Sequence, residues 1–172
     1  MVRKATKKDI PTIAKLYNDV IDYQSANGNY MSWIKNVYPT HSTAENALML
    51  DTLYVFDLNG FVFGSVILDC IQPQEYMNIN WITPDNNALV IHTLCVDPEH
   101  MGMGIASEML TFAKSLAKSL GCSPIRLTTN SKNMGAIHLY EKNGFSIVEY
   151  NAALLDGKIE CPRQCFMEHI II

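Results

Sequence analysis

The chain has 172 residues, of which 48% are hydrophobic and 17% charged, and its formal net charge is −4. This length and composition predict one globular domain, residues 1–172, that buries its own core without metal or disulfide support. The acidic balance argues against non-specific nucleic-acid binding. No apolar run resembles a signal peptide or a membrane span, so we expect a cytoplasmic protein with no membrane partner.

The cysteines indicate neither a disulfide framework nor a metal centre. Their number is odd, and no two form a Cys-x-x-Cys pair. Cys161 and Cys165 lie near His169, as some metal ligands do. However, Pro162 and the apolar strand expected from Phe166 argue against three ligands on one helical face. We therefore expect no metal.

Two helices are predicted near the start of the chain. Residues 9–24 carry apolar side chains at helical spacing, with Pro11 in the first turn, where a missing N–H costs little. Residues 27–42 show no regular pattern. A short helix follows, which we expect Thr43 to cap and Leu50 to end.

A hairpin and a loop are predicted next. The apolar runs 53–56 and 61–68 flank Asn59-Gly60, a pair typical of a tight hairpin turn. From residue 71 to residue 87 the chain loses periodicity and contains prolines, so we predict a mobile loop there.

The second half of the chain alternates strands with helices. The expected order is a strand at 88–96, a helix to Leu120, a strand at 125–129, a helix ending at Asn143-Gly144, and strands at 145–150 and 165–171. A right-handed crossover joins the strands 88–96 and 125–129, so these two strands should run parallel. This order is typical of an α+β fold with a mixed sheet.

The junction after the strand 88–96 is rich in small residues. It contains the run Met101-Gly102-Met103-Gly104-Ile105-Ala106 and opens a helix. Short side chains at a helix N-terminus leave its first N–H groups open to a phosphate or pyrophosphate. The P-loop pattern is absent, and the G-x-G-x-x-G fingerprint fails at Ser107. For the glycines alone, a tight turn without a ligand is the alternative.

A second motif, Asn133 to Phe145, completes a resemblance to the GNAT superfamily of acyl-CoA-dependent N-acetyltransferases. The family pattern Gln/Arg-x-x-Gly-x-Gly/Ala, which follows a strand ending in Leu-x-Val, falls on Leu94, Val96, Met101, Gly104 and Ala106. The pattern Asn-x-x-Ala-x-x-Leu-Tyr-x-x-x-Gly-Phe falls on Asn133, Ala136, Leu139, Tyr140, Gly144 and Phe145. The detailed likeness covers residues 89–150. Met101 departs from the pattern, because the family usually carries Gln or Arg there.

The resemblance implies both a fold and a cofactor site. The fold is α+β, with a mixed central sheet flanked by helices on both faces and a splayed parallel strand pair that forms the CoA cleft. Acetyl-CoA is the implied co-substrate, and its expected contacts are Leu94, Cys95, Val96, Met101, Gly102, Met103, Gly104, Ile105, Ala106 and Asn133. The backbone N–H groups near 94–96 are expected to bind pantetheine, while the side chains of Leu94 and Val96 pack in the core. Because Met101 replaces the usual Gln or Arg, we expect CoA binding to be weakened at most and not lost.

The resemblance also implies catalytic roles. Tyr140 is the expected general acid for the leaving thiolate, and a tyrosine that only packs its ring against the sheet is the alternative. His92 is the candidate general base, and the alternative is a hydrogen-bonded core histidine. Glu75, Asp85 or a water could take its place. Cys95 is expected to be buried packing and not a nucleophile.

We therefore expect an N-acetyltransferase that moves the acetyl group of acetyl-CoA directly to a primary amine of a small molecule. Residues 23–42 and 71–87 are expected to form the acceptor wall, since the cofactor needs neither. Two alternatives stay open: a non-catalytic acyl-CoA-binding sensor or partner domain, and a protein N-terminal or lysine acetyltransferase. A homodimer is also left open.

Overall fold

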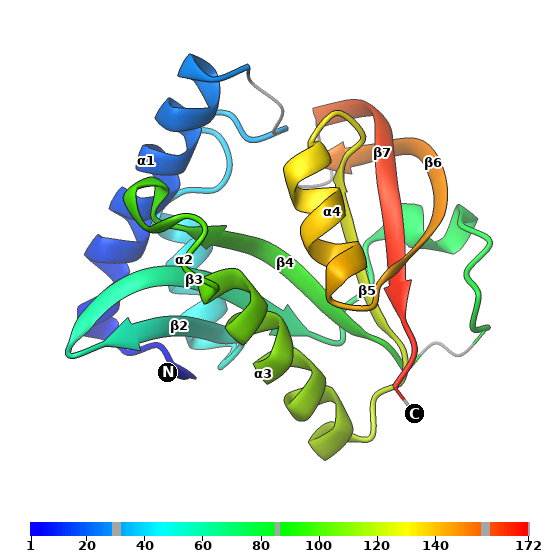
Figure 1. Cartoon of the computed structure of the whole chain (residues 1–172), viewed down its shortest axis with the longest axis horizontal. Helices are drawn as coiled ribbons and strands as arrows, with labels where there is room; N and C mark the ends of the chain where they lie inside the picture. The colour runs from blue at the N-terminus through cyan, green and yellow to red at the C-terminus, as the bar shows by residue number, and fades with distance from the viewer. Residues whose placement is uncertain (29–31, 85–86, 156–158, 172) are drawn as a thin grey trace. The chain divides into compact units, whose positions relative to one another are not determined.

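The structure, a computed structural model, describes residues 1–28, 32–84, 87–155 and 159–171 (Figure 1). Its strands follow the order β1-β2-β3-β4-β5-β7-β6 in a mixed seven-stranded sheet. The chain divides into two compact units. Unit 1 comprises Met1–Asn29, Trp33–Leu68 and His92–Phe112, and unit 2 comprises Tyr30–Ser32, Asp69–Ile91 and Ala113–Ile172. No helix among the described residues is long and apolar enough to cross a membrane.

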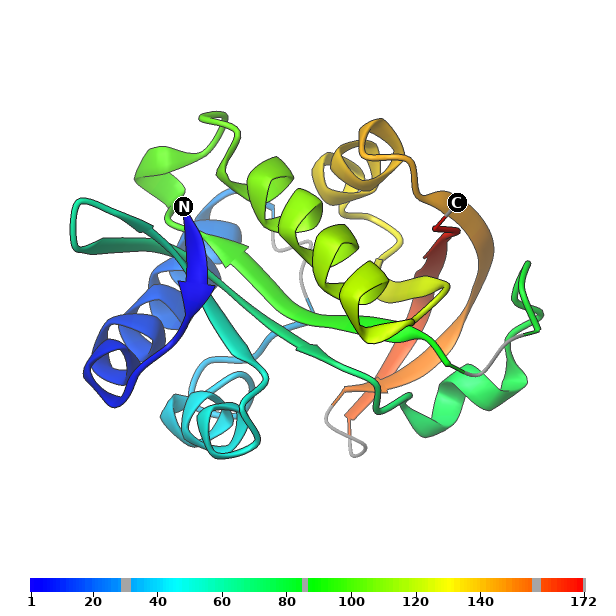
Figure 2. The ribbon, with the colours of Figure 1, turned by 90° about the horizontal axis from the view of Figure 1, so that it is seen from below.

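Unit 1 is built on an antiparallel meander with helices on both faces. Its elements are β1 (Val2–Lys4), the 3-10 turn η1 (Lys7–Asp9), α1 (Ile10–Ala26), α2 (His41–Met49), β2 (Leu53–Leu58), β3 (Phe61–Asp69), part of β4 (Leu89–Val96), the 3-10 turn η3 (Pro98–His100) and the first half of α3 (Ile105–Leu120). Helices α1 and α2 lie on one face of these strands and α3 lies on the other (Figure 2). The predicted helices on both faces of the sheet are thus confirmed.

Local signals explain most of the boundaries in unit 1. Asn59 and Gly60 have φ values of 54° and 86°, the positive pair that a tight hairpin turn requires. The predicted cap of α2 is wrong: Thr40 caps the helix, and its side chain accepts from the Thr43 N–H. Thr43 is instead the third helical residue, and its hydroxyl oxygen accepts from the Thr40 N–H at 3.0 Å. The three-residue strand β1 was not predicted.

Unit 2 contains the predicted parallel pair. Its elements are the 3-10 turn η2 (Gln74–Asn78), the start of β4, the end of α3, β5 (Ile125–Asn130), α4 (Met134–Lys142), β6 (Ser146–Leu155) and β7 (Ile159–His169). Strands β4 and β5 pair in parallel from Leu89↔Ile125 to Ile91↔Leu127, which confirms the predicted crossover. Strand β7 pairs antiparallel with both β5 and β6. Strand β6 ends later, and β7 begins earlier, than the sequence predicted, because the two strands pair with each other along this extra length.

The segment 71–84 is anchored, so the prediction of a mobile loop is wrong for these residues. It forms η2, and it buries Tyr76 and Ile79 with Val90 and Phe166. The ring of Trp81 packs 4.9 Å from the ring of Tyr76, centroid to centroid. Residues 85 and 86 of the predicted loop lie outside the described residues.

A buried ion pair holds the same segment. Arg126 is 1% exposed, and its Nε donates to Glu168 at 3.0 Å. The other two guanidinium nitrogens donate to the side chain of Gln72 at 2.6 Å and to the Thr83 carbonyl at 2.5 Å. The Thr83 N–H in turn donates to Glu168 at 2.9 Å. The charged groups of Arg126 and Glu168 are therefore bonded to each other and to Gln72 and Thr83 of the anchored segment.

Candidate active site

In unit 1, β4 ends in a braced turn that leads into α3. The Asp97 N–H donates to the Phe63 carbonyl of β3 at 2.8 Å. The Asp97 carboxylate accepts from the Glu99 N–H at 3.0 Å and contacts His100 Nδ1 at 3.0 Å. The His100 ring packs 4.2 Å from the Phe63 ring, centroid to centroid. These contacts fix the turn before the glycines begin.

The two glycines of this turn adopt a conformation that other residues rarely use. Gly102 and Gly104 have φ values of 79° and 84°. Apart from chain neighbours, a Cβ added at either glycine would meet no described atom within 4 Å. Helix α3 begins at Ile105, directly after Gly104, so neither glycine places a side chain beside the first turn of the helix. Residues 101–106 thus form a glycine cradle at the start of α3.

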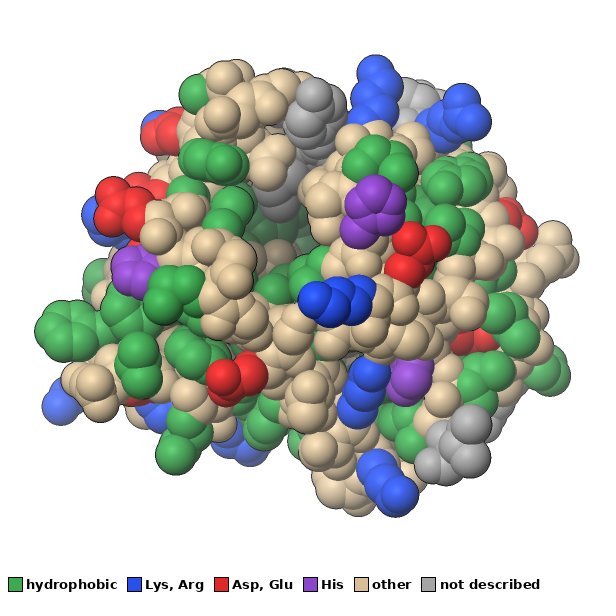
Figure 3. Space-filling view, viewed as in Figure 1, with side chains coloured by type: hydrophobic (Ala, Val, Ile, Leu, Met, Phe, Trp, Pro, Cys, Tyr) green, Lys and Arg blue, Asp and Glu red, His purple; other side chains and the backbone are tan. Residues whose placement is uncertain are grey.

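The methionines of the turn point outward. Met101 is 42% exposed and Met103 is 65% exposed. Figure 3 shows hydrophobic side chains gathered over this turn and over the tip of the β2–β3 hairpin, where Leu58 and Phe61 are also exposed. The side chain of Met101 is therefore available beside the cradle and does not belong to the core.

The burial pattern of β4 differs from the prediction at Leu94 and Val96. Thr93 and Cys95 are buried, whereas His92, Leu94 and Val96 are half-buried. The side chains of Leu94 and Val96 are therefore not the core positions that we expected. Burial alternates along this part of the strand, and the core positions are the odd-numbered ones.

Cys95 is the buried packing residue that the sequence predicted. Its thiol lies 3.3 Å from the Ser65 hydroxyl, and burial raises its pKa to about 11. Across the same face, a Cβ added at Gly64 would lie 3.0 Å from both the Cys95 carbonyl oxygen and the Met109 sulfur. Gly64 therefore permits a close approach of β3 to β4 that the sequence analysis did not identify.

In unit 2, α4 presents the second motif. The Asn133 side chain accepts from the Ala136 N–H at 3.2 Å and so caps the helix N-terminus. Tyr140 is 7% exposed, and burial raises its pKa to about 12. Its ring packs edge-on against Phe145 with centroids 5.8 Å apart. Lys114 donates to the Asn143 carbonyl, which fixes the end of the helix.

The remaining candidates are distributed as follows. Glu75 lies half-buried in η2, and Asp85 lies outside the described residues. Cys165 is fully buried, and nothing is described of the Cys161 side chain. Within the described part of the chain, no three His, Cys, Asp or Glu residues are grouped as metal ligands.

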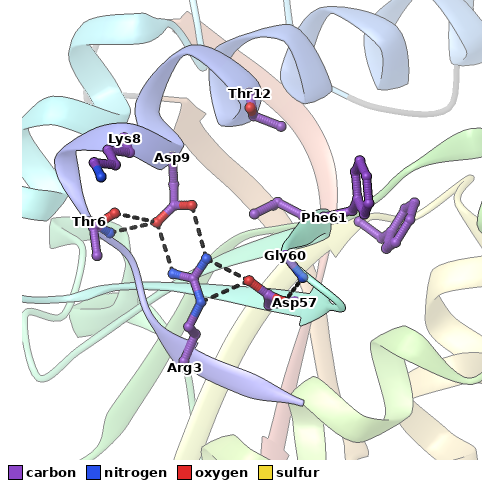
Figure 4. Close-up of a pocket in the computed structure, with 10 residues that line it drawn as sticks. Arg3, Thr6, Lys8, Asp9, Thr12, Asp57, Gly60 and Phe61 are labelled. Carbon is purple, nitrogen blue, oxygen red and sulfur yellow. Dashed lines mark hydrogen bonds and ion pairs between the residues drawn. The ribbon is translucent and has the colours of Figure 1, made fainter.

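A pocket of about 510 Å³ in unit 1 is separate from these residues (Figure 4). Its polar centre is Arg3, whose guanidinium donates to Asp9 at 2.8 and 3.0 Å and to Asp57 at 2.7 and 3.0 Å. The Arg3 guanidinium, the Thr6 bonds and the adjacent charge lower the pKa of Asp9 to about 2. The charges of Arg3, Asp9 and Asp57 thus bind one another, and none of the predicted site residues lines this pocket.

Comparison with known proteins identifies the family. The pattern of the acetyltransferase (GNAT) family matches residues 25–145. An uncharacterised N-acetyltransferase of Methanocaldococcus jannaschii is 33% identical over 97 residues, covering 55% of this chain and 39% of the relative. A streptothricin acetyltransferase of Escherichia coli is 35% identical over 91 residues, covering 53% of this chain and 50% of the relative. The chain thus spans half or less of these relatives.

Solved structures show the same fold. A GNAT-family acetyltransferase from Streptococcus agalactiae has a TM-score of 0.80 at 18% identity, over 99% of this chain and 94% of that one. The yncA protein of Salmonella typhimurium, solved with its cofactor acetyl-CoA, has a TM-score of 0.70 at 18% identity, over 100% of this chain and 94% of that one.

Proposed function

The chain belongs to the acetyltransferase (GNAT) family, and on that premise we propose that it transfers the acetyl group of acetyl-CoA directly to a primary amine. The observation that carries the proposal is the glycine cradle after β4. Gly102 and Gly104 both have positive φ, and both leave open space beside the start of α3. A pyrophosphate can approach N–H groups there without meeting a side chain.

The residues present fit acetyl-CoA. We assign the pyrophosphate to the backbone from Met101 to Ala106, and pantetheine to the backbone N–H groups from Leu94 to Val96. Asn133 caps α4 with its side chain and is a further contact for the cofactor. Acetyl-CoA supplies a thioester, and the chain supplies donors and a proton source around it.

We assign the proton transfers to Tyr140 and His92. The amine nitrogen forms the new C–N bond and loses a proton, while the C–S bond breaks and the sulfur leaves as a thiolate. Tyr140 protonates that thiolate, and its raised pKa of about 12 keeps the phenol protonated near neutral pH. His92, or a water beside it, accepts the proton of the amine.

For the acceptor we propose a small molecule. The streptothricin acetyltransferases of Escherichia coli and Streptomyces lavendulae are 35% and 32% identical over their matched regions. Residues 23–42 and 71–87 form the acceptor wall in this proposal. Within the second segment, Gln72 and Thr83 are bonded to Arg126, and Thr83 is also bonded to Glu168. Cytoplasmic residence and a single domain over 1–172 stay predictions, and a homodimer stays open.

Tyr140→Phe tests the proposal, because it removes the proton donor and keeps the ring. With streptothricin and a panel of small primary amines as acceptors, we expect turnover to fall roughly 10²-fold or more. The affinity for CoA and the melting temperature should hardly change. Tyr150→Phe is the matched control, since Tyr150 is 46% exposed on β6.

Two outcomes would count against this function. Wild-type turnover by Tyr140→Phe would remove the phenol from the mechanism. Tight CoA binding without acetylation of any amine would favour the non-catalytic acyl-CoA sensor instead.

A further inference from the structure

Two cysteines of unit 2 are in contact, although they lie far apart in the sequence. Cys70 follows β3 and Cys122 follows α3, and their Sγ atoms are 3.4 Å apart. Both residues are present as thiols. An S–S bond is about 2.05 Å long, so the two sulfur atoms have to come closer before they can bond, but they already face each other.

The backbone around Cys122 is held by hydrogen bonds. The Cys122 N–H donates to the Ala117 carbonyl at 2.9 Å, near the end of α3. The Asn87 side chain donates to the Gly121 carbonyl at 2.8 Å, and the Asn87 carbonyl accepts from the Ser123 N–H at 3.1 Å. Cys122 is only 3% exposed. Its thiol is therefore fixed in place and shielded from reagents in solution.

Cys70 differs from Cys122 because its side chain is exposed. The Asp69 carboxylate accepts from the Ile71 N–H at 2.8 Å, which orders the backbone on both sides of Cys70. Cys95 and Cys165 are buried, so Cys70 is more accessible to an oxidant than either of them. An accessible cysteine beside a second cysteine that can bond to it is the arrangement found in redox-sensitive proteins.

We propose that Cys70 and Cys122 form a reversible disulfide when the protein meets a peroxide. The Cys70 thiolate attacks one oxygen of hydrogen peroxide, the O–O bond breaks, and the hydroxide that leaves takes up the proton lost by the thiol. The Cys122 sulfur then attacks the resulting sulfenic acid while its own proton departs. The S–S bond forms, the S–O bond breaks, and hydroxide leaves with that proton as a second water. Two thiols are thus oxidised and one peroxide is reduced.

The disulfide would restrain the segment 71–84, because Cys70 directly precedes it. Cys122 lies just before β5, and Gln72 of the segment already accepts from Arg126 of β5 at 2.6 Å. The new bond would therefore add a covalent tether beside an existing polar one. A disulfide that forms and is reduced again also agrees with the absence of a disulfide framework, since intracellular disulfides are usually transient. The proposal is independent of the proposed acetyl transfer.

Mass spectrometry of the full chain tests the proposal directly. The reduced protein is treated with a small molar excess of hydrogen peroxide and then with iodoacetamide, which alkylates the remaining thiols. We expect the loss of two hydrogen atoms, a linked peptide pair that contains Cys70 and Cys122, and recovery of both thiols with dithiothreitol.

Cys70→Ser should not form the linked pair, and its exposed position makes it the safer variant than one at buried Cys122. Cys165→Ala is the matched control, because Cys165 lies opposite Thr129 near the other end of β5 and its loss leaves the pair intact.

Two further measurements report on the tether. Cys70 and Cys122 are 52 positions apart, so their disulfide closes a long loop of the unfolded chain. Oxidation should therefore raise the melting temperature of the wild type by roughly 5–10 °C, and leave that of Cys70→Ser unchanged. Amide hydrogen exchange should slow in peptides from 71–84, whereas peptides from α1 in unit 1 should exchange as before.

Three outcomes would overturn the proposal. Both thiols could be alkylated after peroxide treatment, Cys70 could gain oxygen atoms without linking to Cys122, or Cys70→Ser could link as efficiently as the wild type. None of these results depends on whether the protein acetylates an amine. Conversely, an inactive protein that forms the Cys70–Cys122 link supports the disulfide and contradicts only the proposed function.

Discussion

At the scale of single residues, Met101 is the departure from the family pattern that can be tested most directly. Its side chain is 42% exposed beside the glycine cradle, so a longer cationic side chain can be accommodated there. We expect Met101→Arg to tighten CoA binding by about 1 kcal/mol, or roughly fivefold in Kd, through a contact with phosphate near the surface. Isothermal titration calorimetry with CoA measures this change.

Met103→Arg is the matched control for that variant. Met103 lies two positions further along the same turn and is 65% exposed. Its replacement by arginine therefore adds the same charge at another point of the turn. Equal tightening by both variants would indicate a general charge effect. No tightening by Met101→Arg would mean that position 101 does not face the phosphates.

The sequence predicted the local elements of this site better than the backbone conformation within them. The motifs located the glycine turn before α3 and the helix that carries Asn133 and Tyr140, because each depends on residues close together in the chain. The left-handed conformation of Thr93 has no local signal, since threonine favours extended backbone in a strand. The placement of Cys70 beside Cys122 depends on how the ends of β3 and α3 meet, which no local pattern encodes.

At the scale of secondary-structure elements, the Arg126–Glu168 pair should determine whether the segment 71–84 stays attached. Both side chains are fully buried, and Glu168 is bonded to both Arg126 and Thr83. Glu168→Leu leaves a buried guanidinium without its charge partner, so we expect a loss of about 3–5 kcal/mol in unfolding free energy. The double variant Arg126→Met/Glu168→Leu should lose less than that single variant.

Urea unfolding of the two single variants and the double variant checks this expectation as a double-mutant cycle. A double variant that loses the sum of the two single losses would contradict it.

The same pair explains why the loop was mispredicted. Its prolines and polar residues indicate irregular structure, but the groups that hold it lie on β5 and β7, far away in the chain.

A second element-scale contact joins β1, η1 and β2 through Arg3, Asp9 and Asp57. Asp9 has a pKa of about 2 in the folded chain, below the ordinary value near 3.9 of an unfolded aspartate. A lowered pKa contributes stability that is complete above the unfolded value and is lost as the pH falls through the folded value. We therefore expect stability to decline from about pH 4 toward pH 2, and Asp9→Asn to flatten that decline while being less stable at pH 7.

Melting temperatures of the wild type and Asp9→Asn, measured from pH 7 down to pH 2, check this expectation. If the melting temperature of Asp9→Asn fell with pH as steeply as that of the wild type, the assignment would be wrong.

This ion-pair cluster also accounts for β1, which the sequence did not predict. Three residues carry too little pattern to identify a strand. Its register against β2, from Val2↔Phe56 to Lys4↔Tyr54, is accompanied by the bonds of Arg3.

At the scale of the whole molecule, two elements belong to both compact units. Strand β4 contributes Leu89–Ile91 to unit 2, where it pairs with β5, and its remaining residues to unit 1. Helix α3 likewise passes from unit 1 into unit 2 after Phe112. Neither unit has a complete copy of these elements, so we expect neither to fold alone. The chain should therefore unfold as one domain.

Fluorine NMR of protein labelled with 5-fluorotryptophan can test this expectation during thermal unfolding, because Trp33 reports on unit 1 and Trp81 on unit 2. Both resonances should lose their native signals at one melting temperature, with a calorimetric enthalpy of about 120 kcal/mol for a chain of this length. Acetyl-CoA at about 100 times its Kd should stabilise the folded state by about 2.7 kcal/mol. The melting temperatures reported by the two resonances should therefore rise by the same amount. Loss of the Trp33 signal at a lower temperature than the Trp81 signal would instead mean two separately folding domains. If acetyl-CoA raised the melting temperature reported by only one of the two signals, the cofactor would be assigned to that unit alone.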